Sequence, residues 1–428
     1  MHLKHWLGLF LLLVSVTARA DLEVTVSGGE TGALPIAIVP FADPNGTNFD
    51  IAKIIEADLT RTGQFKALPR TDMLATPSQP SQINYANWRQ VNMDNLVIGQ
   101  LTKDANGRIK ARFFLMDTLR GQQVLGYDMP AATPDRMRSI AHQIADLIYQ
   151  KLTGIKGDFD TKIAYITATG MGVSRAFSLV VADADGYSPH VLATSREPLV
   201  SPAWSPDYTR IAYVGFDHSQ SAIYIQTLAT GKVRKVVAEK GINGSPAWSP
   251  DGRKLAVTLS FETNPDIYII DLESGARRRL TTLYSIDTEP AWSPDGQNIV
   301  FTSDRGGQPQ IYQMPVAGGD PRRLTFQGKQ NLRASYSPDG KSLVLVNLTD
   351  SVYRIALLDL ASGSMQYLSD GPLDESPGFS PNGNVIIYAT QDGNGAELAT
   401  VSLDGRVKQR MHQAGGDVRE PAWSSLSP

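Results

Sequence analysis

Short apolar runs alternate with polar turns along the C-terminal part of the chain, and the stretch from Pro246 to Glu289 shows the pattern clearly. Its runs are separated by Pro250-Asp251-Gly252 and Glu273-Ser274-Gly275, in which proline presets its own φ and glycine accepts a positive one. The pattern predicts a meander of four short strands and no helix. These strands are Pro246–Ser249, Lys254–Leu259, Asp266–Asp271 and Arg278–Thr281.

The same unit returns at a nearly constant spacing. Its aromatic position recurs in steps of 44, 44, 44, 43 and 44 residues, at Trp204, Trp248, Trp292, Tyr336, Phe379 and Trp423. A period in the forties built from four strands is the size of one blade of a β-propeller. We interpret the aromatic side chains as packing between neighbouring blades.

The two ends of the repeat array are complementary. The first blade, residues 162–193, lacks an aromatic strand before it, whereas Pro421–Ser424 has no blade after it. If the last strand pairs beside Ile163–Thr167, the ring closes without an open seam. The sequence therefore predicts a mainly β protein with a six-bladed propeller over residues 161–428.

A different pattern precedes the propeller. Residues 34–153 mix buried strands with segments of helical spacing, and residues 154–160 form a linker. We therefore expect a separate small α/β domain. Its expected elements include a strand at Leu34–Phe41, helices at Asn48–Thr62 and Trp88–Met93, a hairpin around Arg120-Gly121, and a helix that opens at Thr133-Pro134.

Residues 1–20 resemble a secretory signal: a weakly basic start, an apolar run from Trp6 to Val16, and Ala18-Arg19-Ala20. We expect cleavage after Ala20 and export from the cytoplasm. The mature chain has 38 basic and 43 acidic residues, which disfavours nucleic-acid binding. No other apolar run reaches 18 residues, so we expect a protein that is not inserted in a membrane, and the absence of cysteine excludes disulfides.

Residues 21–33 form a distinct N-terminal arm. Leu22, Val24 and Val26 alternate with Glu23 and Thr25, and glycines follow at positions 28, 29 and 32. Two interpretations are open. The segment is a frayed terminus or an edge strand of its own domain, or it is a flexible arm that adds itself to a partner's sheet, since main-chain pairing needs only an extended segment.

Catalytic and metal-binding motifs are missing from the sequence. Neither G-x-S-x-G nor a complete P-loop occurs, and the histidines of the mature chain are scattered without metal-ligand spacing. We therefore predict a non-catalytic protein with no cofactor and no metal.

Loops on a rigid scaffold are the usual place for recognition. One propeller face carries the Pro-Asp-Gly turns, and the linker enters from that side, so the α/β domain should lie there and leave the opposite mouth open. The polar residues just upstream of the inner strands either bind a partner at that mouth or merely cap the strands. They are Glu197, Asn243, Asp287, Thr288, Glu289, Asn331, Arg333, Glu375 and Glu420.

The repeats and the N-terminal domain together resemble the TolB family of periplasmic Tol–Pal proteins. The resemblance spans the mature chain and includes Lys151–Gly157, Ile163-Ala164-Tyr165, Asp185-Gly186-Tyr187 and Phe301–Asp304. It implies a scaffold for outer-membrane integrity and constriction at cell division. The mouth would hold the peptidoglycan-associated lipoprotein Pal, and in some cases imported bacteriocins, while Leu22 to Val26 would pair with the C-terminal domain of TolA. The rival interpretation is a peptidase-type or small-ligand-binding propeller.

Overall fold

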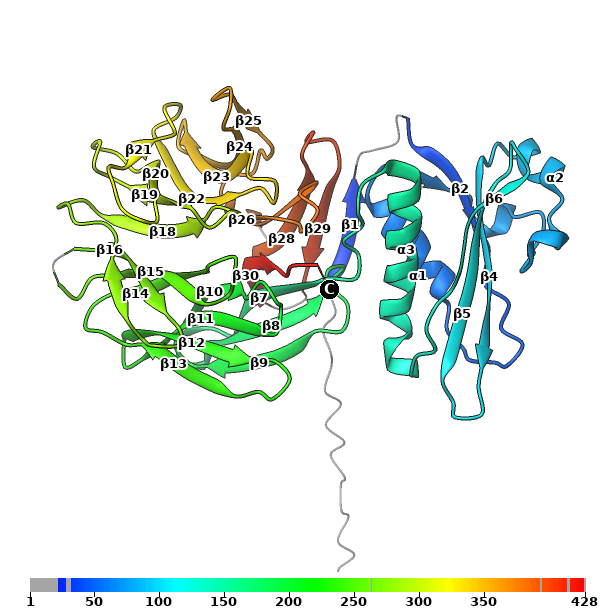
Figure 1. Ribbon diagram of the computed structural model, residues 1–428, viewed down its shortest axis with the longest axis horizontal. Helices are drawn as coiled ribbons and strands as arrows, with labels where there is room; N and C mark the ends of the chain where they lie inside the picture. Colours follow the sequence, from blue (N-terminus) through cyan, green and yellow to red (C-terminus); the bar gives the residue numbers. More distant parts are fainter. Residues whose placement is uncertain (1–21, 28–31, 263, 393–394, 414–415, 427–428) are drawn as a thin grey trace, which may run out of the picture.

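The computed structural model describes residues 22–426, apart from 28–31, 263, 393–394 and 414–415. An α/β domain and a six-bladed propeller lie side by side (Figure 1). The predicted fold class is therefore confirmed. The predicted signal sequence and its cleavage site lie outside the described residues. No helix among the described residues is long and apolar enough to cross a membrane.

The α/β domain is built on a five-stranded sheet with the order β3-β2-β4-β5-β6, in which β2 runs parallel to β3 and β4. Ile36 and Ile38 of β2 pack against α1 and α3, whereas Ala37 packs toward Trp88 of α2, because successive strand residues point to opposite faces. The elements are β2 (Leu34–Ile38), α1 (Ile51–Arg61), β3 (Phe65–Ala67), α2 (Tyr85–Gln90), β4 (Asn95–Lys103), β5 (Ile109–Asp117), β6 (Gln122–Asp128) and α3 (Met137–Thr153).

Local capping sets the helix boundaries. The side chain of Asp50 accepts a hydrogen bond from the Lys53 N–H at 3.1 Å and starts α1. Asn84 caps α2 in the same way, so this helix lies earlier than the predicted Trp88–Met93. The helix expected to open at Thr133-Pro134 begins as a 3₁₀ turn, and α3 proper ends at Gly154, whose φ is 79°.

Each blade is an antiparallel four-stranded meander. The first three blades, from inner to outer strand, comprise β30 (Gly416–Trp423), β7 (Lys162–Thr169), β8 (Ala176–Asp183) and β9 (His190–Ser195); β10 (Leu199–Trp204), β11 (Arg210–Asp217), β12 (Gln220–Thr227) and β13 (Val233–Val237); β14 (Asn243–Trp248), β15 (Lys254–Leu259), β16 (Asp266–Asp271) and β17 (Arg277–Arg279).

The remaining three blades follow the same order, and the last gains a fifth strand, β1, from the N-terminal arm. They comprise β18 (Asp287–Trp292), β19 (Asn298–Ser303), β20 (Gln310–Pro315) and β21 (Arg322–Arg323); β22 (Gln330–Tyr336), β23 (Ser342–Thr349), β24 (Val352–Asp359) and β25 (Met365–Tyr367); β26 (Glu375–Phe379), β27 (Val385–Asp392), β28 (Gly395–Ser402), β29 (Lys408–His412) and β1 (Glu23–Ser27).

The ring closes as the sequence predicts. The C-terminal strand β30 pairs antiparallel with β7, with Trp423 opposite Ile163. The tryptophans join neighbouring blades: the indole N–H of Trp248 donates to the Ala203 carbonyl at 3.0 Å, and that of Trp292 to the Ala247 carbonyl at 3.1 Å. At the closure, Trp423 donates to the Thr161 hydroxyl at 2.8 Å. Each of these three indoles thus has a polar partner.

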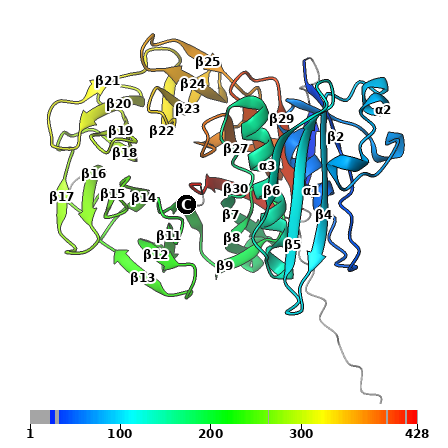
Figure 2. The ribbon, with the colours of Figure 1, turned by 45° about the vertical axis from the view of Figure 1, so that its right-hand side comes forward.

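The α/β domain lies beside blades 6 and 1 (Figure 2), and its contact with Asn382 puts it on the side of the Pro-Asp-Gly turns. The Asn382 amide, in the equivalent turn of blade 6, donates to the Lys156 carbonyl at 3.1 Å, and the Gln409 amide donates to the Arg61 carbonyl at 2.8 Å. This placement agrees with the expectation from the linker, and it leaves the opposite mouth of the propeller uncovered by the α/β domain.

Candidate partner-binding site

The inner strands share a bulge that shapes the central channel. In every blade the pairing between the first and second strands shifts at the same place, three residues before the aromatic position. In five blades the next residue is proline, which has no N–H to donate, so the bulge leaves no ladder bond unmade there. The bulged residues all have φ between 49° and 57°: Ser201, Ser245, Glu289, Arg333, Ser376 and Glu420.

A positive φ in a residue other than glycine is uncommon, and strained conformations of this kind collect at functional sites. Three of the six bulged residues, Glu289, Arg333 and Glu420, were predicted from the sequence, whereas Ser201, Ser245 and Ser376 were missed. All six bulged residues could have been found in the sequence, because each lies three positions before the repeated aromatic residue, whatever its own residue type.

Arg333 forms an ion pair with Glu420 that crosses the channel. Their strands, β22 and β30, are not neighbours in the ring, because β26 lies between them. The Arg333 side chain is still 33% exposed, so the channel around it is open to solvent. Burial alone would lower the pKa of Arg333, but the charges of Glu420, Glu289 and Glu375 raise it above its ordinary value.

Backbone N–H groups and a hydroxyl hold two of the channel carboxylates, Glu289 and Glu420. The Glu289 carboxylate accepts from the Arg333 N–H at 2.9 Å and from the Thr302 hydroxyl at 2.8 Å. Burial raises the pKa of Glu420, but the Arg333 charge and a hydrogen bond from the Ser201 backbone outweigh it and lower that pKa. These bonds fix the carboxylates in place, so the channel presents a preformed set of charges.

A second ion pair lies one residue upstream in the inner strands. Arg419 of β30 contacts Glu375 of β26 at 3.3 Å, and both side chains are 36% exposed. Thr288 of β18 occupies the equivalent position and is half-buried. We define the channel group as Thr288, Glu289, Arg333, Glu375, Arg419 and Glu420. The prediction missed Arg419, although its repeat position is the same as that of Glu375.

Three predicted contact residues are corrected by the structure. Asn243, Asp287 and Asn331 lie at the starts of their inner strands, as the first or second residue, and are 0% exposed, so their side chains do not present a surface to a partner. They hold loops instead: the Asn243 amide donates to the Glu239 carbonyl at 2.7 Å, and Asp287 pairs with Arg305 at 2.8 Å.

The remaining predicted positions behave in a similar way. Asn331 bridges Gln310 and the Gln327 carbonyl, each at 2.8 Å. Glu197 is half-buried and accepts from the Ser219 N–H at 3.1 Å, so it ties two mouth loops together. The capping interpretation therefore fits the three fully buried residues, whereas Glu197 and the channel group keep partly exposed side chains.

The N-terminal arm is docked on the propeller. Strand β1 pairs antiparallel with β29, with Val24 opposite Met411 and Thr25 opposite Arg410. Leu22 is buried in the core between blades 6 and 1, and its N–H contacts the Gly186 carbonyl. The arm is therefore an edge strand of the propeller. The interpretation of the arm as an edge strand of its own domain was wrong, because among the described residues β1 does not pair with the α/β domain that follows it in sequence. The pairing of the arm with TolA stays a prediction.

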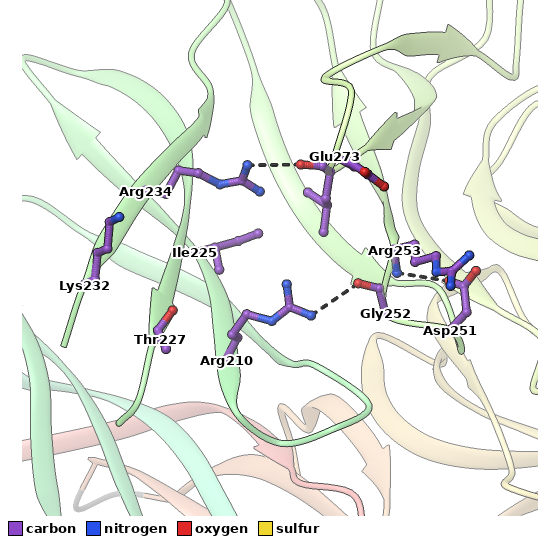
Figure 3. Close-up of a pocket in the computed structure, with 10 residues that line it drawn as sticks. Arg210, Ile225, Thr227, Lys232, Arg234, Asp251, Gly252, Arg253 and Glu273 are labelled. Atoms are coloured by element: carbon purple, nitrogen blue, oxygen red, sulfur yellow. Dashed lines mark hydrogen bonds between the residues drawn. The ribbon is translucent and has the colours of Figure 1, made fainter. Parts of the chain in front are cut away.

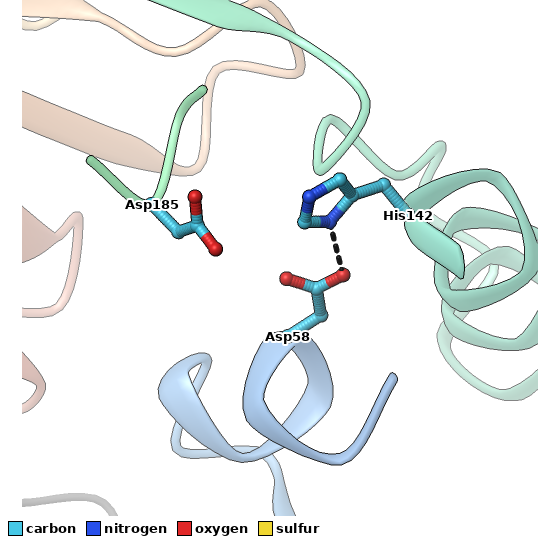
Figure 4. Close-up of side chains that lie close together, drawn as sticks. All are labelled: Asp58, His142 and Asp185. Carbon is cyan, nitrogen blue, oxygen red and sulfur yellow. Dashed lines mark hydrogen bonds and ion pairs between the residues drawn. The ribbon is translucent and has the colours of Figure 1, made fainter. Parts of the chain in front are cut away.

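A buried cluster of Asp58, His142 and Asp185 lies where the two domains meet (Figure 4). The His142 Nδ1 and an Asp58 oxygen are 2.6 Å apart. Three such ligands could surround a cation, but Arg138 pairs with Asp185, and Arg61 lies 3.1 Å from Asp58. These guanidinium groups already supply positive charge, so the cluster is an ion-pair network that fastens the domains.

Comparison with known proteins adds to this geometry. A family model described as "TolB beta propeller domain" matches residues 149–427, and one described as "TolB amino-terminal domain" matches residues 22–124. The chain belongs to the TolB family. A Tol-Pal system protein TolB from Methylococcus capsulatus is 58% identical over 99% of this chain and 98% of the relative.

Other family members are also similar to this chain along almost its whole length. A Tol-Pal system protein TolB from Nitrosococcus oceani is 55% identical over 99% of this chain and 100% of that protein. The crystal structure of TolB from Acinetobacter baumannii superposes with a TM-score of 0.88 at 39% identity, covering 95% of this chain and 100% of that one. The family therefore includes both domains of this chain.

Proposed function

We propose that this chain is a non-catalytic periplasmic scaffold of the Tol–Pal system, which binds Pal at the open mouth of the propeller and TolA through residues 22–26. In this role it serves outer-membrane integrity and constriction at cell division. Bacteriocin segments would enter the same mouth.

The channel group carries the proposal for the mouth. Its charges are partly exposed and lie on inner strands that the whole ring holds rigid, upstream of the turns that the α/β domain contacts. Pre-oriented charges at a rigid surface favour a specific protein partner, because little side-chain ordering is needed on binding.

Strand β1 of the arm already pairs with β29 and, in this proposal, also has to pair with a strand of TolA. One edge of β1 is already paired with β29, so TolA either adds a strand to the outer edge of β1 or displaces β1 from the propeller. Deletion of residues 21–33 should abolish TolA binding and leave Pal binding intact. Loss of both would mean that the arm supports the propeller structure itself.

The mouth is tested with Thr288→Arg/Glu375→Arg, two half-exposed positions of the channel group. The matched control is Gln297→Arg/Asp320→Arg, which adds the same charge at exposed turns on the opposite face. In calorimetric titrations with purified Pal, we expect at least a tenfold loss of affinity for the first variant and no change for the control. Equal affinities would place the Pal site elsewhere.

The rival function, a peptidase-type or small-ligand-binding propeller, has less support. Within the described part of the chain, the hydrogen bonds of the histidine rings run to Asp58 and to the Pro189 carbonyl, and none joins a serine hydroxyl. Labelling of the purified protein by a serine-reactive fluorophosphonate would support the rival and contradict our proposal.

A further inference from the structure

A groove of about 530 Å³ runs between blades 2 and 3 on the outer wall of the propeller (Figure 3). Its lining includes Asp251 and Gly252 of the Pro-Asp-Gly turn of blade 3. The α/β domain lies beside blades 6 and 1, away from blades 2 and 3 (Figure 2). Its volume is in the usual range for small-ligand sites. Four basic residues line it, Arg210, Lys232 and Arg234 from blade 2 and Arg253 from blade 3, against two acidic ones, Asp251 and Glu273.

Two of the arginines are held in place by backbone carbonyl groups across the groove. Arg210 donates to the Gly252 carbonyl at 3.3 Å and lies 4.6 Å above the Trp248 ring. Arg234 donates to the Leu272 carbonyl at 3.1 Å. Figure 3 shows Ile225 between the two side chains. Because a carbonyl oxygen carries no net charge, Arg234 keeps its full positive charge on the groove, whereas Arg210 also lies 3.8 Å from the Asp207 carboxylate.

The acidic residues leave the groove with an excess of positive charge. The Asp251 carboxylate already accepts from the Ser249 hydroxyl at 2.5 Å and from the Arg253 N–H at 3.0 Å, as part of its own turn. Lys232 and Arg253 are exposed at the two rims. Cationic side chains converging from two blades favour a ligand with more than one negative charge.

The other blades show that the propeller does not need these charges. The turn hydrogen bonds are equivalent in each repeat, so the positions can be matched. The position of Lys232 holds Ala276 in blade 3, and the position of Arg253 holds Gln297 in blade 4. Arg278 of blade 3 donates to the Val316 carbonyl of blade 4, as Arg234 of blade 2 does to the Leu272 carbonyl of blade 3. The arginine at this repeat position therefore joins neighbouring blades. The fold therefore does not require the charges of Lys232 and Arg253.

We propose that the groove between blades 2 and 3 binds a small dianionic ligand, with two phosphate or carboxylate groups on the basic rims and its body over Ile225 and Leu272. This site is separate from the channel mouth and does not depend on the proposed function. Phosphate and carboxylate groups offer the same oxyanion chemistry to arginine and lysine, so the experiment has to distinguish them.

The test uses the mature full-length chain and two probes, pyrophosphate and succinate, in calorimetric titrations at low ionic strength. The variant Lys232→Ala/Arg253→Ala removes two charges but keeps the arginines that fasten the blades. Its control, Lys254→Ala/Lys341→Ala, removes two charges from positions equivalent to Arg210 and Arg253 in other blades. Thermal melting verifies that both variants fold.

We expect one-to-one binding of at least one probe, at least tenfold weaker in the groove variant and unchanged in the control. Binding of pyrophosphate alone would identify a phosphate ligand, and binding of succinate alone a carboxylate ligand. Absence of binding by both probes, or equal weakening in both variants, would overturn the proposal.

Discussion

Arg333 and Glu420 show how single residues shape the channel. Both have positive φ at the bulge, and their side chains meet across the ring from strands that do not touch as neighbours. Glu420 is the more enclosed member, with only 18% of its side chain exposed. Removing its partner would leave a largely buried carboxylate unpaired, and such a group costs more than an exposed ion pair contributes.

We therefore expect Arg333→Ala to lower the free energy of unfolding by about 1–3 kcal/mol at pH 7. The control Arg419→Ala, which breaks a pair that is about one third exposed, should cost less than about 1 kcal/mol. Urea denaturation measures both. Because pairing lowers the pKa of Glu420, its contribution is present at neutral pH and is lost as the pH falls through that pKa. Equal costs at pH 7 would contradict this account.

The pKa of Asp146, in the interior of α3, shifts in the opposite direction. It accepts from the Phe159 N–H at 2.8 Å and from the Asp160 N–H at 3.3 Å, which fastens the linker, yet burial raises its pKa to about 7 from 3.8. A raised carboxylate pKa means that ionising the group opposes folding. The native state thus loses stability from this residue as the pH rises from about 4 to about 7.

Asp146→Asn keeps an oxygen acceptor and removes the charge. Relative to the original chain, the variant should gain stability as the pH rises from about 4 to about 7, by at most about 4 kcal/mol. In the control Asp404→Asn the relative stability should change in the opposite direction, because a hydrogen bond from Ser402 lowers the Asp404 pKa. Urea midpoints between pH 4 and pH 8 measure both, and a pH-independent difference for Asp146→Asn would disprove the assignment.

At the scale of elements, the docking of β1 determines how a partner reaches the arm. The strand covers the edge of β29, and its own outer edge is the edge of the five-stranded blade. Exposed edges of this kind accept further strands. Neighbouring residues of a strand direct their N–H groups to opposite edges, so Val24 and Thr25 differ in which edge they serve.

Single proline substitutions at Val24 and Thr25 distinguish the two ways in which TolA could bind, by adding to the docked arm or by displacing it. One of Val24→Pro and Thr25→Pro loses the bond to β29, and the other loses the donor on the outer edge. If TolA adds to the docked arm, both variants should bind at least tenfold more weakly. If TolA displaces the arm, the variant that loosens docking should bind as well or better. Val24→Ala and Thr25→Ala control for the side chains, and unchanged binding in both proline variants would exclude main-chain pairing.

At the scale of the molecule, closure by β30 turns six blades into one rigid body. The strand completes blade 1 through β7 and also contacts the inner strands β10 and β26 on either side. Its loss would expose the edge of β7 and the buried faces of blades 6 and 1.

Removal of residues 416–428 should therefore lower the melting temperature by 10 °C or more, or prevent folding, because the core shared by blades 6 and 1 is opened. Removal of residues 426–428 alone leaves β30 intact and should change the melting temperature little. Differential scanning calorimetry compares the two truncated chains, and a stable fold after the larger deletion would contradict closure.

The period of the repeats was sufficient to predict the six blades and the closing strand, and the entry point of the linker predicted the face that carries the α/β domain. The prediction of the site was less complete. Asn243, Asp287 and Asn331 have polar side chains next to inner strands, but their burial depends on loops such as that at Gln327, about which sequence spacing says nothing. The docking of β1 on β29 was also hidden, because an extended segment can pair with any free edge.

Hydrogen–deuterium exchange of the mature chain with and without purified Pal tests the central claim most directly. The account predicts slower exchange on Pal binding at the mouth, in residues 286–289, 330–333, 372–376 and 416–420. Exchange should not change in the groove between blades 2 and 3. Protection confined to the Pro-Asp-Gly turns or to the α/β domain, with the channel unchanged, would contradict a scaffold that binds its partner at the propeller mouth.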